Sequence, residues 1–508
     1  MQGSTKIIFN TGITYARAVV TALISLYSTR VVLSSLGASD FGIFNVIGGV
    51  VAMLAFLNAA MTTSTQRYLS FNLGKGDLSL VKKIFANSVV IHLVIGLIIV
   101  LFIEGIASYL IGNKLQIDSS RIEVARYILH FTVASTFITV ISVPYDAVVN
   151  AHENMIFLAI VTIIEAILKL LVALSLFIVP GDKLFYFGLL TMFSAILIRL
   201  IKRTYSKRKY EECRITIMQW YDLREIKELT SFASWQLFGT LCSLGRNQGV
   251  AIVLNFFYST VVNAAYGIAN QINAQLMFFS QTMMSAMRPQ IMKSEGSNDR
   301  DRVIRLSLSA NRLSFYLFTF FALPLYFQMP FVLDLWLKEV PQYTVEFCRA
   351  ILLLTMANQI NMGLMTAVQA IGKIKLYQTV AGGIQLLTLP IGFWFLKIGY
   401  PSYSIVLVSF VLECISTVFR VFYFRYLTGY PAWKYFLGVI LRSVLTLLPA
   451  AIFLIIIGEK LPEGITGFLV CIISSILIYV GSLVLYGLDR SEKRIFKEIT
   501  RKLFKIII

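Results

Sequence analysis

Charged residues are scarce in this chain, and those that occur are mostly basic. Only 14% of the 508 residues are Asp, Glu, Lys or Arg, whereas 57% are hydrophobic and the mean hydropathy is +0.76. Soluble domains carry roughly 25% charged residues. The deficit excludes an ordinary soluble protein and predicts an integral membrane protein with many spans.

Histidine and cysteine are too sparse and too scattered for the sites that usually hold metals or nucleophiles. The three histidines are isolated from one another, and the five cysteines contain no C-x-x-C pair. Neither a zinc site nor a disulfide framework is therefore predicted. A convincing Walker A, H-E-x-x-H or G-x-S-x-G motif is also missing. We expect a protein that is not an enzyme and has no metal or resident cofactor. Any energy input would come from an H+ or Na+ gradient, from the substrate gradient or from consumption downstream.

Long apolar runs take the place of these motifs. A hydrocarbon core about 30 Å thick requires roughly 20 apolar residues per helix. The expected spans are 7–34, 40–71, 80–112, 121–150, 154–179, 184–205, 231–257, 260–288, 305–334, 343–371, 376–397, 402–427, 434–458 and 465–488. They predict about fourteen transmembrane helices joined by short loops.

Lysine and arginine are concentrated in alternate loops. If the N-terminus is cytoplasmic, about 30 lie on the cytoplasmic side and about six on the other. The positive-inside rule then places both termini in the cytoplasm. The net charge of +19 therefore reflects topology, and we expect no nucleic-acid partner.

A faint internal repeat divides the chain. The matching segments are Phe41–Asn45 with Tyr266–Asn270, Ala86–Asn87 with Ala310–Asn311, and Val149–Ala151 with Val368–Ala370, at offsets of about 225, 224 and 219 residues. Their order is preserved. Such duplication is typical of transporters whose substrate path lies between the two halves.

These patterns predict an all-α membrane fold with two pseudo-symmetric six-helix lobes and two additional C-terminal helices. The expected boundaries are 1–205 for the N-lobe, 206–230 for a basic cytoplasmic linker, 231–428 for the C-lobe, 429–488 for helices 13 and 14, and 489–508 for a basic cytoplasmic tail. Apolar residues alternate with charges in the linker and recur at helical spacing in the tail. We expect both to form amphipathic helices at the membrane surface, with a frayed tail as the alternative.

Two arginines inside expected spans are the main binding candidates. Arg17 lies near the middle of the first span, on a polar stripe with Asn10 and Thr14, and Arg246 lies in the first span of the second half. A charge in the bilayer usually marks a cavity, a partner or a pathway. The planar guanidinium also suits phosphate. A cavity with both arginines on its walls would attract an anion. The alternatives are that each pairs with an internal carboxylate, such as Asp146, Glu165 or Glu413, or that it lies shallower in the membrane.

Amide side chains form the second set of candidates. They both donate and accept hydrogen bonds, which suits a sugar. Hydrogen bonding between helices is an equally good interpretation. The candidate sugar-binding residues are Asn10, Thr14, Asn247, Asn270, Asn273, Asn358 and Asn361.

Three further ionisable residues have two interpretations each. Asp146 is a candidate for ion coupling, but Pro144 also makes it a candidate helix-end residue near the cytoplasm. Arg67 and Arg288 end their spans on the cytoplasmic side, where they would meet an incoming phosphate or act as ordinary positive-inside anchors.

Several segments resemble the polysaccharide flippases of the O-antigen (Wzx) type. The segments are Arg30–Leu33, Asp40–Asn45 and Thr65–Leu69 in the first half, and Gly245–Val250, Val262–Ala269 and Pro289–Ile291 in the second. That family belongs to the MOP superfamily, together with MATE multidrug exporters and lipid II flippases. The resemblance implies two six-helix lobes around a V-shaped cavity, two extra helices and alternating access. The family's cationic cavity would correspond to Arg17 and Arg246.

The implied substrate is a polyprenyl-pyrophosphate-linked oligosaccharide, turned over in a bacterial cytoplasmic membrane. Membrane lipids, a glycan polymerase or glycosyltransferases would be the partners. A lipid II flippase and a MATE-type drug exporter remain alternatives, although buried arginines disfavour the cationic cargo of the latter. A membrane-embedded glycan polymerase, ligase or acyltransferase fits less well, because large external loops and a catalytic histidine are missing from the sequence.

Overall fold

The computed structural model describes residues 3–52, 55–113, 119–258, 260–337, 339–457, 464–489 and 492–493. Secondary structure in these ranges is helical throughout, without a strand, as expected. The chain forms two compact units. Unit 1 comprises Met1–Lys6, Phe238–Ile291 and Asp299–Ile508, and unit 2 comprises Ile7–Leu237 and Met292–Asn298.

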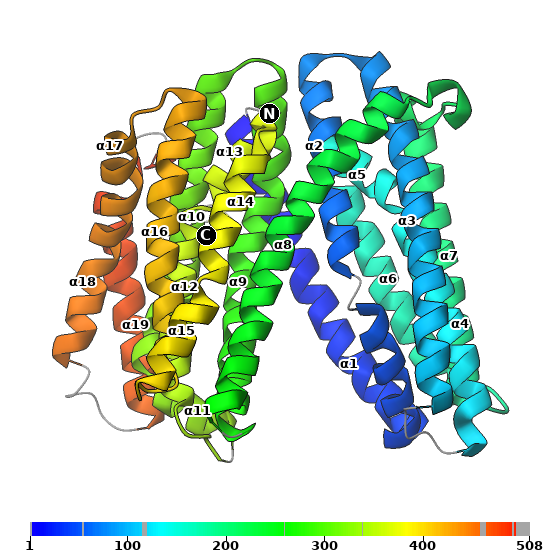
Figure 1. Ribbon diagram of the computed structural model, residues 1–508, viewed down its shortest axis with the longest axis horizontal. Coiled ribbons are helices and arrows are strands. Elements are labelled where there is room, and N and C mark those ends of the chain that lie inside the picture. Colours follow the sequence, from blue (N-terminus) through cyan, green and yellow to red (C-terminus); the bar gives the residue numbers. More distant parts are fainter. Residues whose placement is uncertain are drawn as a thin grey trace, which may run out of the picture. The chain divides into compact units, whose positions relative to one another are not determined.

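Unit 2 is built from the helices of the first half of the chain, drawn from blue to cyan in Figure 1. The first helix, α1, is interrupted at Gly37, whose φ of 77° favours glycine. Its two parts therefore belong to two different expected spans. The elements are α1 (Gly3–Ala52), α2 (Ala55–Lys75), α3 (Leu78–Asn113), η1 (Ser119–Arg121), α4 (Ile122–Val140), α5 (Val143–Ala151), α6 (Met155–Ser175), α7 (Lys183–Lys209), η2 (Glu211–Cys213), η3 (Ile217–Trp220) and the start of α8 (Leu223–Phe257).

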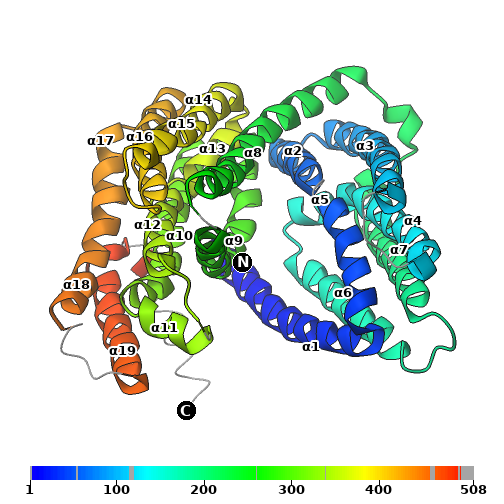
Figure 2. The same cartoon turned by 60° about the horizontal axis from the view of Figure 1, so that its bottom comes forward.

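Unit 1 contains the remaining helices, apart from the last turn of α9. Within it, α18 and α19 pack against each other and against α10 (Figure 2). The elements after α8 are α9 (Thr260–Gly296), α10 (Arg300–Phe327), α11 (Met329–Trp336), α12 (Thr344–Gln359), α13 (Met362–Ile371), α14 (Ile374–Leu386), α15 (Thr388–Lys397), α16 (Ser404–Thr428), α17 (Ala432–Tyr435), the π-helical η4 (Phe436–Leu441), α18 (Arg442–Ile457), α19 (Ile465–Ser482) and the π-helical η6 (Leu483–Gly487).

Ten helical segments in the described ranges are long and apolar enough to cross a membrane, and the bent pair α10–α11 brings the number to eleven. This identifies a multi-pass membrane protein. The spans expected at 231–257 and 260–288 coincide with the long helices α8 and α9, which are not among the ten. Their many amide and charged side chains lower the hydropathy below that of a lipid-facing helix. The same side chains made them candidates for a substrate path.

Helix boundaries repeat between the two halves at the offset of the third sequence match. The corresponding ends, each 219 residues apart, are Val140 and Gln359, Val143 and Met362, Met155 and Ile374, and Lys209 and Thr428. Each half therefore breaks one spanning helix at the same place, into α4–α5 in one half and α12–α13 in the other. The repeat proposed from three short sequence matches extends through this whole stretch.

The linker after α7 differs from the expected amphipathic helix. It forms the two short 3-10 turns η2 and η3, both in contact with α3. Tyr210 and Cys213 are buried in the same apolar core as Leu69 and Ile84. Burial raises the pKa of the Cys213 thiol and of the Tyr210 phenol, so both groups are neutral at physiological pH. The linker is therefore part of unit 2 and its core.

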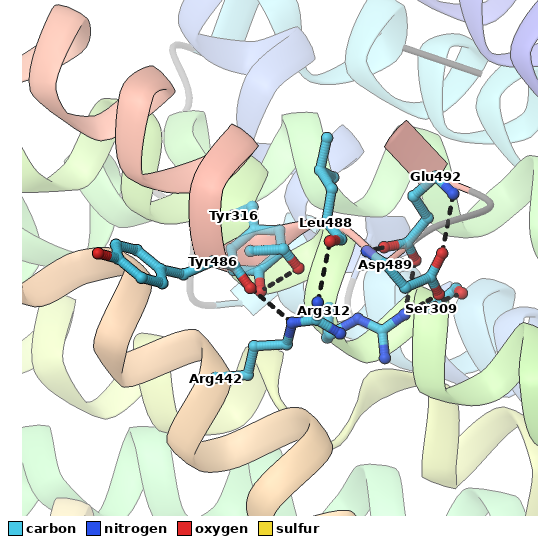
Figure 3. A network of polar contacts seen from close by, with 9 residues as sticks. Ser309, Arg312, Tyr316, Arg442, Tyr486, Leu488, Asp489 and Glu492 are labelled. Atoms are coloured by element: carbon cyan, nitrogen blue, oxygen red, sulfur yellow. Dashed lines mark hydrogen bonds and ion pairs between the residues drawn. The ribbon is translucent and has the colours of Figure 1, made fainter. Parts of the chain in front are cut away.

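Two arginines, Arg312 on α10 and Arg442 on α18, bind the end of η6 and the residues that follow it (Figure 3). Arg312 on α10 is bound to Asp489 at 2.9 Å and to Glu492 at 2.7 Å. Arg442 donates hydrogen bonds to the carbonyl oxygens of Tyr486 and Leu488 at 2.6 and 2.9 Å. These contacts hold the end of η6 in unit 1. The basic tail expected at 489–508 lies outside the described residues from 494 onward.

Candidate functional site

Arg246 lies on α8 in unit 1, and its side chain is buried. Its Nε and Nη2 groups donate to the Oδ1 atom of the adjacent Asn247 at 3.2 and 3.0 Å. The charge of Glu413 attracts this guanidinium and that of Arg420 repels it. Arg246 forms no ion pair with a carboxylate among the residues that the structure describes. Its recorded hydrogen-bond acceptor is Asn247.

A buried polar network lies at the break between α12 and α13. Glu413 and Arg420, seven residues apart on one face of α16, form an ion pair of 2.5 Å. The Asn361 amide donates to Glu413 at 3.3 Å and to Thr417 at 2.7 Å. The Glu413 Oε2 and Asn361 Oδ1 atoms, and both polar atoms of Gln359, are buried without a partner in the described ranges. Several hydrogen-bond acceptors thus remain unsatisfied inside unit 1.

From the sequence, Glu413 was considered only as a possible carboxylate partner of Arg17 or Arg246. The i, i+7 spacing of Glu413 and Arg420 places the two residues on one face of a helix, and this was the signal that could have revealed their pairing.

Arg17 lies on α1 in unit 2 and is half-buried. Within the described part of the chain it forms no hydrogen bond or ion pair. The carboxylates considered as its partners are bound elsewhere, since the recorded pairs are Asp146 with Lys202 at 2.9 Å, Glu165 with Lys169 at 2.9 Å, and Glu413 with Arg420. None of these three carboxylates forms an ion pair with Arg17 or Arg246 among the described residues. Arg17 belongs to unit 2, whereas Arg246 belongs to unit 1.

Two residues of the polar stripe beside Arg17 form hydrogen bonds within unit 2. Asn10 and Thr14 are both buried, and the Thr14 hydroxyl donates to the Asn10 carbonyl at 2.8 Å. The Asn10 amide donates to the Glu153 carbonyl at 3.5 Å. These contacts favour the structural interpretation for both residues.

The other amides in unit 1 differ in their surroundings. Asn247 is exposed and accepts from Arg246. Asn270 and Asn358 are half-buried, and each donates to a carbonyl of its own helix, that of Tyr266 at 2.9 Å and that of Leu354 at 3.0 Å. Asn273 contacts the sulfur of Met277 at 3.6 Å, while its buried Oδ1 has no partner among the described residues. Asn361 belongs to the Glu413 network.

Arg67 and Arg288 occupy different environments. Arg67 on α2 is buried, and its guanidinium lies 4.4 Å from the centroid of the Tyr68 ring and 5.4 Å from that of Phe232. This enclosure favours a packing role over an exposed phosphate contact. Arg288 on α9 is half-buried, and its Nε has no partner in the described ranges.

Asp146 sits in the first turn of α5 and binds Lys202 of α7. No group of three or more His, Cys, Asp or Glu residues in the described chain could hold a metal ion.

Comparisons with known proteins agree with this architecture. Residues 17–174 match the family model named MatE. A MATE protein solved in its bent conformation is 14% identical and superposes with a TM-score of 0.74 over 84% of this chain and 97% of its own. An outward-facing multidrug resistance MATE family transporter of the MOP superfamily gives 0.68 at 14% identity, over 84% and 96%.

A MOP superfamily transporter from Pyrococcus furiosus, described by the reverse polarity of its binding pocket, gives a TM-score of 0.67 at 14% identity over 84% and 97% of the two chains. No curated protein matches the sequence. The fold is therefore that of the MATE transporters, as expected from the sequence.

Proposed function

We propose that the protein is a flippase that moves a polyprenyl-pyrophosphate-linked oligosaccharide, an O-antigen or capsule repeat unit, across a bacterial cytoplasmic membrane. The observation that carries the proposal is that Arg17 and Arg246 are at least half-buried in helices and have no carboxylate partner among the described residues. Guanidinium groups within a bilayer are costly unless something compensates them. A pyrophosphate supplies that compensation for part of the transport cycle.

The mechanism follows from the chemistry of these side chains. Arg17 and Arg246 donate hydrogen bonds to pyrophosphate oxygens, which accept bidentate pairs well. The exposed amide of Asn247 and the half-buried amides of Asn270 and Asn358 solvate hydroxyl groups of the sugars. The polyprenyl chain stays in the lipid. Alternating access spares the polar head group a passage through hydrocarbon, which would cost several kcal/mol for each unpaired polar group.

Coupling to an H+ or Na+ gradient is part of the proposal. Asp146 already pairs with Lys202, whereas Glu413 has a buried oxygen without a partner among the described residues and two guanidinium groups nearby. We therefore favour Glu413 over Asp146 as the residue through which a cation affects Arg246. Glycosyltransferases or a polymerase would act on the same lipid-linked substrate before and after transport.

A MATE-type drug exporter is the second candidate, because the MatE match and the solved MATE structures support it equally well. Its cationic cargo would require carboxylates in the path, whereas this chain offers Arg17 and Arg246, which form no ion pair among the described residues. The transporter from Pyrococcus furiosus, with its reversed pocket polarity, illustrates that this fold accommodates such a change. A lipid II flippase would differ only in the sugar lipid that it accepts.

The test is to delete the protein in its host and to identify the lipid-linked saccharides that accumulate, using a membrane-impermeant glycan probe on intact and on opened cells. We expect a complete unit on the cytoplasmic side, rescued by the wild type but not by Arg17→Gln/Arg246→Gln. Arg30→Gln, which removes an exposed charge from the same helix α1, serves as the matched control. Full rescue by the double variant at equal protein level would refute the anion site. Altered drug sensitivity without accumulation would favour the exporter, and accumulation on the outer leaflet would favour a polymerase or ligase.

A further inference from the structure

The turn between α5 and α6 contains an unusual residue for its backbone conformation. Glu153 has a φ of 58°, in the left-handed region that is unfavourable for a side chain with a Cβ atom. The corresponding turn of the second half, 219 residues later, has Gly372 with a φ of 89°. Glycine is the relaxed choice in this conformation. A glutamate that occupies it is a candidate for a function that outweighs the strain.

Glu153 connects two helices that are far apart in the sequence. Its carboxylate, whose side chain is 6% exposed, binds the Nζ atom of Lys293 at 2.9 Å. Its carbonyl oxygen accepts the hydrogen bond from Asn10 on α1. Arg17 lies seven residues after Asn10 on the same helix, about 10 Å along its axis. One residue thus contacts both the last turn of α9 and the helix that carries Arg17.

The neighbours of Glu153 fix the turn to other parts of unit 2. The Nε2 atom of His152 lies 2.7 Å from the Glu212 carboxylate, and its ring stacks on Tyr210 at 4.3 Å. The Asn154 amide donates to the hydroxyls of Tyr205 at 2.7 Å and Tyr210 at 3.1 Å. His152 and Asn154 therefore bind the turn to α7 and the linker, while Glu153 reaches toward α1 and α9.

The last turn of α9 approaches the backbone of α2 closely. A Cβ atom at Gly74 would collide with the Lys293 carbonyl, and one at Gly296 would collide with the Phe71 carbonyl. Met292–Asn298 belongs to unit 2, whereas the preceding part of α9 belongs to unit 1. Glycine at both positions permits this close backbone approach. An ion pair placed beside it is well suited to hold the contact reversibly.

We propose that the Glu153–Lys293 ion pair is a releasable latch, which holds the last turn of α9 in unit 2 and connects it, through Asn10, to the helix that carries Arg17. The latch opens and closes in the intact protein. The carboxylate explains why a glutamate stands where the second half has a glycine. The inference rests on contacts within unit 2 and does not depend on the identity of the transported molecule.

The test is hydrogen exchange on the full-length protein in lipid nanodiscs, combined with thermal unfolding. Glu153→Gln and Lys293→Gln each remove one charge, and we expect exchange in 292–298 to become about tenfold faster in either variant, equivalent to about 1.4 kcal/mol. The Tm should change by no more than a few degrees. The exchanged pair Glu153→Lys/Lys293→Glu should restore most of the protection. Unchanged exchange in both single variants would overturn the latch.

A second pair of variants separates the latch from backbone strain. Glu153→Gly removes strain and carboxylate together, so the Tm should stay level or rise while exchange at the end of α9 still accelerates. Asn298→Gly is the matched control, because Asn298 has a φ of 59° in the same unit and takes no part in the latch. It should leave exchange in 292–296 unchanged. A lower Tm in Glu153→Gly, with faster exchange throughout unit 2, would assign Glu153 a purely structural role and refute the proposal.

Discussion

The two halves of the chain build the same helix break from different residues. In the first half the break between α4 and α5 is followed by Pro144, which lacks a backbone donor and suits the first turn of a helix. The corresponding position, 219 residues later, is Gly363, whose backbone N–H donates to Asn311 at 2.6 Å. The two halves therefore share a backbone path that different residues can form.

The polar chemistry beside the two breaks differs more than the backbone. The half in unit 1 has the Glu413–Arg420 pair, with side chains 0% and 8% exposed. The half in unit 2 has Asp146–Lys202, at 26% and 17%. The residues equivalent to Glu413 and Arg420 are Ser194 and Ile201. Among the described residues, the more deeply buried ion pair beside a break thus lies in the half that also carries Arg246.

The largest expected effect sharpens this contrast. Glu413→Gln leaves Arg420 buried without its counter-charge, which should cost about 3–5 kcal/mol of unfolding free energy. Asp146→Asn should cost less than about 1.5 kcal/mol, because its pair is partly exposed. Equilibrium unfolding of the two purified variants under the same conditions measures the difference. Equal losses of unfolding free energy would mean that the difference in burial between the two ion pairs does not determine their contributions to stability.

The next prediction concerns the break itself. A Cβ atom at Gly363 would collide with the backbone carbonyl of Ser307, so Gly363→Ala should cost about 1–3 kcal/mol. Pro144→Ala, at the equivalent position, should change stability by less than about 1 kcal/mol. Gly383→Ala is the control for adding a methyl group, because nothing lies within 4 Å of its Cβ position. If Gly363→Ala left the Tm unchanged, the close approach of Gly363 to Ser307 would not be the cause of this break.

A smaller effect is expected at the paired asparagines of the repeat. Asn311 donates to the Tyr435 hydroxyl at 3.0 Å and accepts from Gly363, whereas Asn87 donates to the Trp220 carbonyl at 3.2 Å and accepts from Asp222 at 3.0 Å. Replacement of either by alanine should cost about 1–2 kcal/mol, because buried partners lose their hydrogen bonds. Asn311→Ala should lower the Tm, whereas Asn87→Ala should mainly expose the linker to proteolysis. Identical proteolysis of the linker in both variants would contradict this division.

The sequence was informative wherever one local pattern determined the outcome. Apolar runs predicted the helices, and the match of Val149–Ala151 with Val368–Ala370 predicted an offset that the helix boundaries reproduce. The linker escaped prediction because its apolar residues suggested a membrane surface, whereas tertiary contacts with His152 and Asn154 decide its structure.

The candidate site was predicted in part for a similar reason. A buried arginine is visible in a sequence, but its partners are not. That Asp146 binds Lys202 and Glu413 binds Arg420, rather than Arg17 or Arg246, depends on packing between helices and on rotamers. Asn10 and Thr14 looked like part of a sugar site because a helical stripe gives spacing but not the neighbouring helix. The latch at Glu153 had no sequence signal other than its position opposite Gly372 in the repeat.

The smallest expected effect concerns the linker, which follows only the first half. The backbone N–H of Arg224 and the ammonium of Lys83 lower the pKa of Asp222 below its ordinary value of 3.8. Because the folded pKa is the lower one, this carboxylate stabilises the linker above about pH 4 and ceases to do so as the pH falls through the folded pKa. Hydrogen exchange in 217–226, corrected for its intrinsic pH dependence, should show a loss of protection below pH 4 in the wild type. Asp222→Asn should lack that step, and the same step in both proteins would assign it to another group.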